Sequence, residues 1–327
     1  MGSLFAIPAA IAAFFIRLGW IRGVALLVGL GFSFVLLVSL VAGVSESLAS
    51  PAEATAEEEF HKHPKHLALA SDGPLGKFDR QQLQRGFQVY KEVCAACHGL
   101  SLVAFRDLHD LGYEEPEVKA IANQWAIEVP TVNPETGEAA TRKAIPADRF
   151  PDPYANETAA RAANNNALPP DLSLMAKARE GGPAYIYSLL TGYRNPSPEL
   201  LRKFPDSKPG AGLYHNPYFA NLNLAMPPPL TGEGQVTYAE GNPRPTVDQM
   251  SKDVSAFLMW AAEPKLENRH RYGWATIIFL LIATVLGYLS YQNIWASAKR
   301  KVAPVGPLDP VNKAKRQRAS KKAGVTK

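Results

Sequence analysis

Two cysteines and the histidine after them, Cys94, Cys97 and His98, form the pattern C-x-x-C-H, which constrains this chain more than any other feature. The pattern is typical of covalent c-type haem attachment, in which each thiol adds to one haem vinyl group and the next residue offers an imidazole to the iron. A zinc site would need a second pair of ligands, and the chain has no other cysteine. A thioredoxin-like redox pair shares the C-x-x-C spacing but does not need the histidine. The pattern therefore predicts one covalently attached haem c.

The formal net charge of +5 combines two parts of opposite sign. Residues 299–327 carry ten Lys or Arg and one Asp, whereas residues 50–270 carry 22 Lys or Arg and 28 Asp or Glu. A basic tail beside an acidic body does not favour nucleic-acid binding by the whole chain. The acidic body, with clusters at Glu57–Glu59 and Glu114–Glu117, favours a basic protein partner, although such clusters also serve solubility alone.

The N-terminal 49 residues are typical of a targeting segment. Residues 23–44 carry no charge, follow Arg17 and Arg22, and precede small residues where a signal peptidase could cut after Ala49. This run is also long enough to span a bilayer, so residues 1–49 are expected to be a signal peptide or an uncleaved signal anchor. The earlier apolar run, residues 4–16, is too short to span.

A second uncharged run, residues 273–295, has Trp274 near one end and Tyr288, Tyr291 and Trp295 near the other. Its length and its aromatic anchors predict a transmembrane helix, over residues 271–298. The basic tail, residues 299–327, follows directly, and the positive-inside rule places it in the cytoplasm or in the matrix of an organelle. The haem domain is then expected on the opposite, periplasmic side of a bacterial inner membrane, the side on which haem is attached covalently in bacteria.

The segments between these runs are expected to be a solvated linker, residues 50–77, and a haem domain, residues 78–270. Asp79 can cap a helix that runs into the haem motif as one rigid element, and apolar residues at helical spacing give that helix one buried face. Leu83, Phe87, Tyr90 and Val93 form this buried face of the helix. Residues 112–160 are polar, and we expect a surface insertion with little core there.

Further short helices are predicted near residues 106–111, 172–180 and 183–192. Residues 195–245 contain many Pro and Gly and little periodicity, and a loop of this length is usually functional. Thr246 and Gln249 form a capping box for a helix that ends before Pro264.

Met226 is the residue best suited to be a sixth iron ligand. It ends the long irregular loop and precedes three prolines, which fix φ and limit the freedom of the loop. Met175, Met250 and Met259 lie in predicted helices, where methionine is usually packing. His215, in the same loop as Met226, is the other candidate.

The ordered set of motifs resembles the cytochrome c1 family, of alpha-proteobacterial type, over roughly residues 75–298. The family carries the haem of ubiquinol–cytochrome c reductase, the cytochrome bc1 complex. The resemblance rests on the helix before CAACH and four later runs: NNNALPPDLS from Asn164, SLLTGY from Ser188, AMPPPL from Ala225 and DVSAFLMWAAEP from Asp253.

The resemblance implies a mainly α cytochrome c fold with large loop insertions and one C-terminal transmembrane helix. It implies one-electron transfer from the Rieske iron–sulfur protein to cytochrome c, with cytochrome b as the membrane partner. The subunit itself would make and break no substrate bonds. The family match makes Met226 the axial ligand opposite His98, and it places four further residues at the haem: Asn164, Pro170, Arg179 and Tyr185. The extra disulfide of some bacterial relatives is absent, so the loop before Met226 must be ordered by packing.

Two other functions remain open from the residues alone. A free-standing, membrane-anchored cytochrome c could feed a terminal oxidase, although the length and the insertions argue against a small carrier. A haem enzyme such as a peroxidase would need a vacant or weakly held sixth position on the iron.

Overall fold

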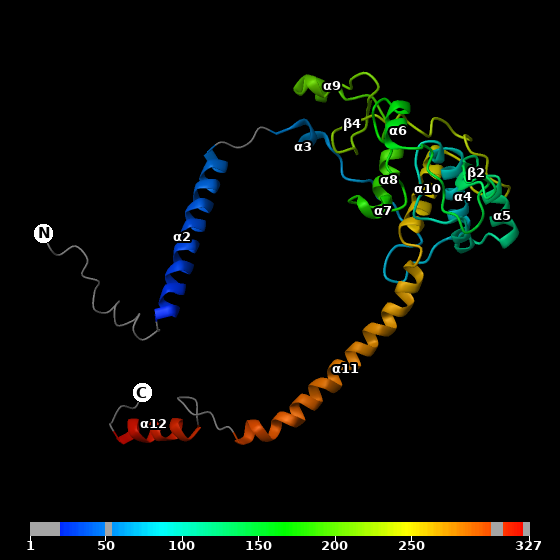
Figure 1. The fold of residues 1–327 in the computed structure, drawn as a ribbon. Helices are drawn as coiled ribbons and strands as arrows, with labels where there is room; N and C mark the ends of the chain where they lie inside the picture. The colour runs from blue at the N-terminus through cyan, green and yellow to red at the C-terminus, as the bar shows by residue number, and fades with distance from the viewer. Residues whose placement is uncertain (1–19, 50–53, 302–309, 323–327) are drawn as a thin grey trace. The chain divides into compact units, whose positions relative to one another are not determined.

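The computed structural model describes residues 20–49, 54–301 and 310–322, which fall into two compact units, residues 1–60 and 61–327. Most of the described residues that have regular secondary structure are helical, and the strands form two short antiparallel pairs (Figure 1). The predicted mainly α class is therefore confirmed.

The first unit contains the long apolar helix α2, Trp20–Ala49, and the short helix α3, Ala56–Phe60. Residues 22–49 are long and apolar enough to cross a membrane, and they include the predicted run 23–44. The apolar run at residues 4–16 lies outside the described residues. A signal peptide and an uncleaved signal anchor both contain such a helix.

The second unit holds the haem domain and the C-terminal helices. Its 3-10 helices are η1 (Cys94–Ala96), η2 (Phe105–Leu111) and η3 (Pro205–Ser207). Its strands are β1 (Val129–Val132) paired with β2 (Ala139–Arg142), and β3 (Tyr214–His215) paired with β4 (Asn223–Leu224). Its α-helices are α4 (Arg80–Glu92), α5 (Glu115–Asn123), α6 (Glu157–Ala163), α7 (Met175–Ala178), α8 (Pro183–Leu190), α9 (Pro198–Lys203), α10 (Val247–Ala262), α11 (Leu266–Lys301) and α12 (Pro310–Lys322).

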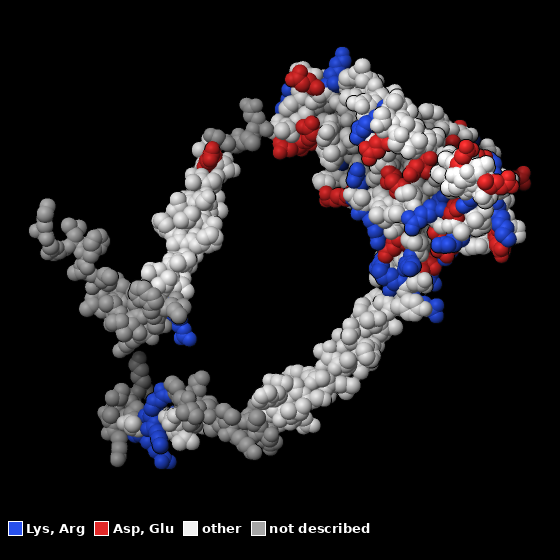
Figure 2. Space-filling view, viewed as in Figure 1, with Lys and Arg blue, Asp and Glu red and all other residues white. Residues whose placement is uncertain are grey.

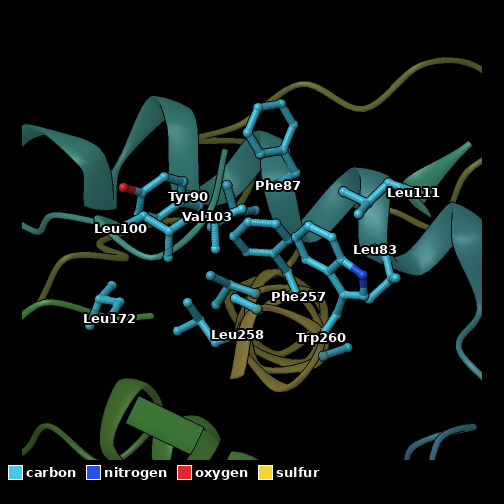
Figure 3. Packing of buried hydrophobic residues seen from close by; sticks show 14 of the residues in the cluster. Leu83, Phe87, Tyr90, Leu100, Val103, Leu111, Leu172, Phe257, Leu258 and Trp260 are labelled. Atoms are coloured by element: carbon cyan, nitrogen blue, oxygen red, sulfur yellow. The ribbon is translucent and has the colours of Figure 1, made fainter. Parts of the chain in front are cut away.

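Helices α4 and α10 cross and form the centre of the haem domain. Gly86 lies at the crossing, where a Cβ would overlap the carbonyl oxygen of Asp253 and the side chain of Phe257. Only glycine allows this approach between the two backbones. Figure 3 shows the aromatic packing there, with Phe87 and Tyr90 of α4 facing Phe257 of α10; the ring centroid of Phe257 lies 5.6 Å from each.

A buried ion pair joins the same two helices. Arg85 Nε donates to Asp253 Oδ2 over 2.9 Å, and Arg85 Nη2 donates to Asp253 Oδ1 over 3.2 Å. The Asp253 side chain is 0% exposed and the Arg85 side chain 10%. Gln82 and Gln249 also donate to this carboxylate, so its charge is fully compensated inside the domain.

The predicted caps of both helices are present, with one difference. Asp79 Oδ1 accepts from Gln81 N and Gln82 N in the first turn of α4, and Thr246 Oγ1 accepts from Gln249 N at the start of α10. The Gln249 side chain does not close the capping box, because it donates to Asp253 instead.

The interpretation of residues 112–160 as an insertion with little core is wrong. Helix α5 buries Val118 and Ala122 completely, and Trp125 and Phe150 are 5% and 2% exposed. The ring centroids of Trp125 and Phe150 lie 4.9 Å apart in the same aromatic cluster. The segment is polar on average, but Val118, Ala122, Trp125 and Phe150 face inward. The strands of its hairpin β1–β2 are half-exposed.

The expectation of a solvated linker also fails for residues 61–77, which belong to the second unit. Lys65 N donates to the buried Ser188 Oγ over 2.7 Å, and the Lys65 ammonium donates to Thr191. The Lys65 ammonium also lies 5.4 Å from the ring centroid of Tyr218, which is a cation–π contact. This segment therefore packs along the haem domain.

The other predicted elements differ mainly in length. Helix α7 is much shorter than the stretch expected at residues 172–180, whereas α8 agrees with its prediction. The irregular segment, residues 195–245, contains the short helix α9, which begins after the cap Ser197. The predicted transmembrane helix is part of the longer helix α11, of which residues 266–296 are long and apolar enough to span a membrane. In the basic tail, residues 302–309 and 323–327 lie outside the described residues.

Candidate functional site: the haem attachment motif

Helix α4 does not continue through the haem motif as expected. It ends at Glu92, and the 3-10 turn η1 begins at Cys94. The backbone N–H groups of Cys97 and His98 both donate to the carbonyl of Cys94, over 3.1 and 2.9 Å. The turn thus places both thiols and the imidazole around one carbonyl group at the end of a rigid helix.

His98 is held by both its side chain and its backbone. Its Nδ1 lies 2.7 Å from the carbonyl oxygen of Pro170, and since a carbonyl only accepts, Nδ1 carries the hydrogen. The carbonyl of His98 accepts from the Tyr90 hydroxyl over 3.1 Å. Burial lowers the pKa of His98 against the opposing effects of Pro170 and Asp171. The ring is therefore neutral, with Nε2 left to bind a metal.

Asp171 fastens the loop that contains Pro170 to the haem motif. Its carboxylate accepts from the backbone N–H groups of Ser101 and Ser173, each over 2.8 Å. Burial by itself raises the pKa of Asp171, but the hydrogen bonds from Ser101 and Ser173 outweigh it and hold the pKa below its usual value. Gly99 lies close to this carboxylate and to that of Asp152, and a Cβ there would make the Asp152 side chain move.

The two thiols suit attachment to haem better than redox or zinc chemistry. Cys94 and Cys97 are half-buried and not joined in a disulfide. Burial, together with the neighbouring Cys97, raises the pKa of Cys94 to about 12, whereas reactive redox cysteines have lowered pKa values. Among the described residues, no group of three or more His, Cys, Asp or Glu could hold a metal ion. One imidazole with Nε2 available, beside two free thiols at the C-x-x-C-H spacing, fits a covalent haem.

The four further haem contacts implied by the resemblance lie in different places. The Pro170 carbonyl contacts His98 directly. The Asn164 side chain donates to Ala160 at the end of α6 and bonds Tyr154, which also bonds the Cys97 thiol. The structure thus brings Asn164 and Pro170 to the motif.

The other two residues lie next to each other, Arg179 at the end of α7 and Tyr185 near the start of α8. Arg179 Nη1 donates to the Ala178 carbonyl over 3.3 Å. Among the described residues, no contact joins either side chain to the cysteines or to His98.

Met226 follows the β3–β4 hairpin. Asn216, which is fully buried, donates from its amide to the Leu189 carbonyl over 2.7 Å and from its backbone to the Leu222 carbonyl over 2.7 Å. The Tyr193 hydroxyl donates to the Met226 carbonyl over 3.1 Å. These bonds order the loop without a disulfide.

His215, the alternative ligand, lines a cavity of about 500 Å³ together with Tyr193 and Pro228. Its side chain is buried, and its Nδ1 has no hydrogen-bond partner among the described residues.

Sequence reasoning missed three tyrosines and one aspartate at this site. Tyr193 lies in the SLLTGY run and Asp171 in NNNALPPDLS, so both were inside recognised motifs but had no assigned role. Tyr90 was assigned to the apolar face of α4 alone. Tyr154 had no signal in the sequence, because only the fold brings it to Asn164 and Cys97.

Comparison with known proteins agrees with these features. The model of the Cytochrome C1 family matches residues 69–298. Cytochrome c1 of Rhodospirillum rubrum is 44% identical over 236 residues, which are 69% of this chain and 85% of that protein. A mitochondrial cytochrome c1 heme protein of Arabidopsis thaliana is 43% identical over 280 residues, 84% of this chain and 86% of that protein.

A cytochrome b/c1 protein of Bradyrhizobium diazoefficiens is 43% identical over 277 residues. These are 80% of this chain but only 39% of that protein, so the chain spans about two fifths of the length of this relative. Two of the three relatives are alpha-proteobacterial, as the resemblance predicted. The family match includes the attachment motif, Met226 and most of the apolar part of α11. The chain therefore belongs to the cytochrome c1 family, a family of haem proteins, which confirms the predicted haem c.

Proposed function

We propose that this protein is the electron-transfer subunit of a proton-translocating quinol–cytochrome c reductase. The protein would accept one electron at a time from a Rieske iron–sulfur protein and pass it to a cytochrome c, and the covalent haem would supply the redox chemistry. The observation that carries this proposal is the family match over residues 69–298, which includes both the attachment motif and the membrane anchor. The subunit transfers electrons only; quinol oxidation belongs to the complex.

Different residues at the site would attach the haem and bind its iron. Cys94 and Cys97 would form the two thioethers, and His98 and Met226 would bind the iron. A haem with His and Met ligands has a higher potential than one with two histidines, which suits an acceptor from a Rieske centre. The Pro170 carbonyl holds the His98 ring in one orientation, and its hydrogen bond makes Nε2 a better ligand.

The remaining groups hold the Met226 loop and the edge of the haem. Tyr193 fixes the backbone of Met226 and so limits how far its side chain can withdraw. Arg179 would meet a haem propionate, since a guanidinium binds carboxylates in a bidentate way, and the neighbouring Tyr185 would lie beside it. Asn164 and Pro170 complete the contacts with the haem.

The membrane arrangement follows from α11 and the tail. We place the haem domain on the periplasmic side of a bacterial inner membrane, with α11 as a single C-terminal anchor and the basic tail in the cytoplasm. Figure 2 shows the basic residues of α12 and the many acidic residues on the haem domain. Cytochrome b is the expected membrane partner, and the name of the Bradyrhizobium relative, cytochrome b/c1, supports this pairing.

The acceptor is expected to be a basic cytochrome c that docks on the acidic body. In the Glu114–Glu117 cluster, Glu117 accepts from Glu114 N at the start of α5, and Glu115 pairs with Lys119 across one exposed helical turn. The first bond caps the helix, so part of this cluster serves structure. The carboxylates of the cluster nevertheless remain on the surface, where they attract a cationic partner.

Isolation of the intact complex tests the proposal. An affinity tag on the chain should co-purify a cytochrome b and a Rieske protein, and the preparation should reduce cytochrome c at the expense of quinol. Cys94→Ala should abolish the two-thioether haem and this activity. If the tagged chain carried a c-type haem but came without cytochrome b and with a terminal oxidase, the free-standing carrier would be the correct function. Rapid carbon monoxide binding to the reduced wild type would instead indicate an open iron site.

A further inference from the structure

A short loop, residues 70–77, joins the haem domain to the first turns of α11. The indole N–H of Trp274 donates to the Pro74 carbonyl over 3.2 Å. Nδ1 of His270 lies 3.1 Å from the Gly76 carbonyl, which can only accept a hydrogen bond. Just beyond the loop, Phe78 N donates to Glu267 over 2.9 Å. Because Trp274 lies at the start of the apolar run, these bonds hold the 70–77 loop at the level where α11 enters the membrane.

The 70–77 loop is tightly built. Lys77 N donates to the Ala70 carbonyl over 2.9 Å and Gly76 N to the Gly73 carbonyl over 3.2 Å. A Cβ on Gly76 would overlap the Ser71 carbonyl, so the backbone folds back on itself at a point that only glycine permits.

The tip of the loop exposes an aliphatic side chain. Leu69 and Phe78, on either side of the loop, are buried at 8% and 9% exposure, whereas Leu75 is 75% exposed. A single exposed leucine is ordinary on a protein surface. Here it lies on a rigid loop that is hydrogen-bonded to the start of a transmembrane helix, and that position gives it a specific environment.

The residues around the loop match the chemistry of the lipid–water interface. Tyr272 and Trp274 are 64% and 45% exposed, and aromatic residues of this kind are enriched at membrane interfaces. Lys77 and Arg271 are exposed, and long basic side chains bury their carbon chains in the interface while their charges stay at the headgroups. Figure 2 shows basic side chains where the haem domain meets α11.

We propose that the 70–77 loop is a second membrane contact of this protein, in which Leu75 enters the interfacial region of the bilayer beside Trp274. Lipid is the molecule that contacts the loop, because the surface around Leu75 is continuous with the apolar part of α11. The apolar window of α11 is not buried by the described parts of the protein. With α11 and the loop both at the interface, the haem domain has two fixed points on the membrane. This inference goes beyond electron transfer and needs only that α11 crosses a bilayer.

Fluorescence quenching by lipids tests the contact. Both native cysteines are consumed by the haem, so Leu75→Cys provides the only reactive thiol for a small fluorophore. The labelled full-length protein is placed in phosphatidylcholine vesicles with and without brominated acyl chains, and the ratio of emission cancels energy transfer to the haem. Val132→Cys is the matched control, because Val132 is an exposed aliphatic residue, at 61%, on the β1–β2 hairpin.

The label at position 75 should lose emission in brominated vesicles and be protected from aqueous iodide, whereas the label at position 132 should respond only to iodide. Equal responses at the two positions would overturn the proposal. The same measurement in the purified complex separates lipid from protein: quenching by brominated lipid supports the contact, and protection from both quenchers shows a partner subunit over the loop and refutes it. An unchanged haem spectrum in each variant establishes that the domain is folded.

Discussion

Removing the buried carboxylate of Asp253 should destabilise the haem domain more than any surface change. Asp253 is fully buried and accepts hydrogen bonds from Arg85, Gln82 and Gln249, so Asp253→Ala leaves the Arg85 guanidinium inside the domain without a counter-charge. Breaking such a pair from one side costs about 3–5 kcal/mol. Native domains are stable by about 5–15 kcal/mol, so this loss is at least about a fifth of the total.

The expected loss can be measured as a shift of the unfolding midpoint. For a domain of this size each kcal/mol corresponds to about 2–4 °C, so Asp253→Ala should lower the midpoint by about 6–20 °C. The assay is thermal unfolding of the full-length haem protein in detergent, followed by tryptophan fluorescence, which the haem quenches in the folded state. Glu115→Ala is the control, since it removes one partner of the exposed pair with Lys119 and should leave the midpoint nearly unchanged.

A double variant distinguishes a buried charge from a general loss of packing. Arg85→Leu combined with Asp253→Leu removes both charges, and it should cost less than the sum of the two single changes to Leu because no uncompensated charge remains. A wild-type midpoint for Asp253→Ala would refute the reasoning. So would a double variant whose loss equals or exceeds that sum, because the two groups would then act independently.

Four further outcomes are expected. Met226→Leu should remove the sulfur-to-iron charge-transfer band, lower the reduction potential and admit carbon monoxide, whereas Met259→Leu, a change on α10, should alter none of these; survival of the band would make His215→Ala the next experiment. Gly86→Ala should cost at least about 1–3 kcal/mol of stability, because the added methyl group forces α4 and α10 apart; an unchanged midpoint would contradict the close crossing. Electron transfer to a basic cytochrome c should slow as salt rises, since charges are screened over about 8 Å at physiological ionic strength; a rate independent of salt, or an acidic acceptor, would count against electrostatic docking. Burial, with the nearby charge of Arg194, lowers the pKa of His215, so the stability it contributes is complete above about pH 6.5 and is lost as pH falls below it; His215→Gln should lose less stability on acidification than the wild type, and an identical pH profile would argue against this role.

The corrections share one cause. The high average polarity of residues 112–160 indicates a surface segment, yet Trp125 and Phe150 complete the aromatic cluster around α4 and α10. The lack of helical periodicity in residues 61–77 indicates a linker, yet their backbone is hydrogen-bonded to Ser188 and to α11. Average composition does not reveal a few inward-facing residues, and extended segments that pair with distant groups have no local pattern.

Local chemistry was determined by the sequence. The C-x-x-C-H spacing fixed the cofactor class, the capping residues Asp79 and Thr246 marked where α4 and α10 begin, and the uncharged run at residues 273–295 predicted the apolar part of α11. Each of these depends on groups within a few residues of one another, so the chain carries the information without a fold. The sequence also limited the sixth ligand to Met226 or His215 from the residues alone, and the family resemblance favoured Met226.

Only the tertiary structure decided how distant groups meet. The carbonyl of Pro170 orients His98 from 72 residues away, Asp253 neutralises Arg85 across the helix crossing that Gly86 permits, and the 70–77 loop meets α11 about 200 residues later in the chain. Such contacts depend on directions in space that a linear pattern does not encode: a proline carbonyl, a glycine without a Cβ and a buried carboxylate look the same in sequence whether or not a partner faces them. The physical reason is that a buried polar group needs a partner wherever the chain brings one, and that place is set by the packing of the whole domain.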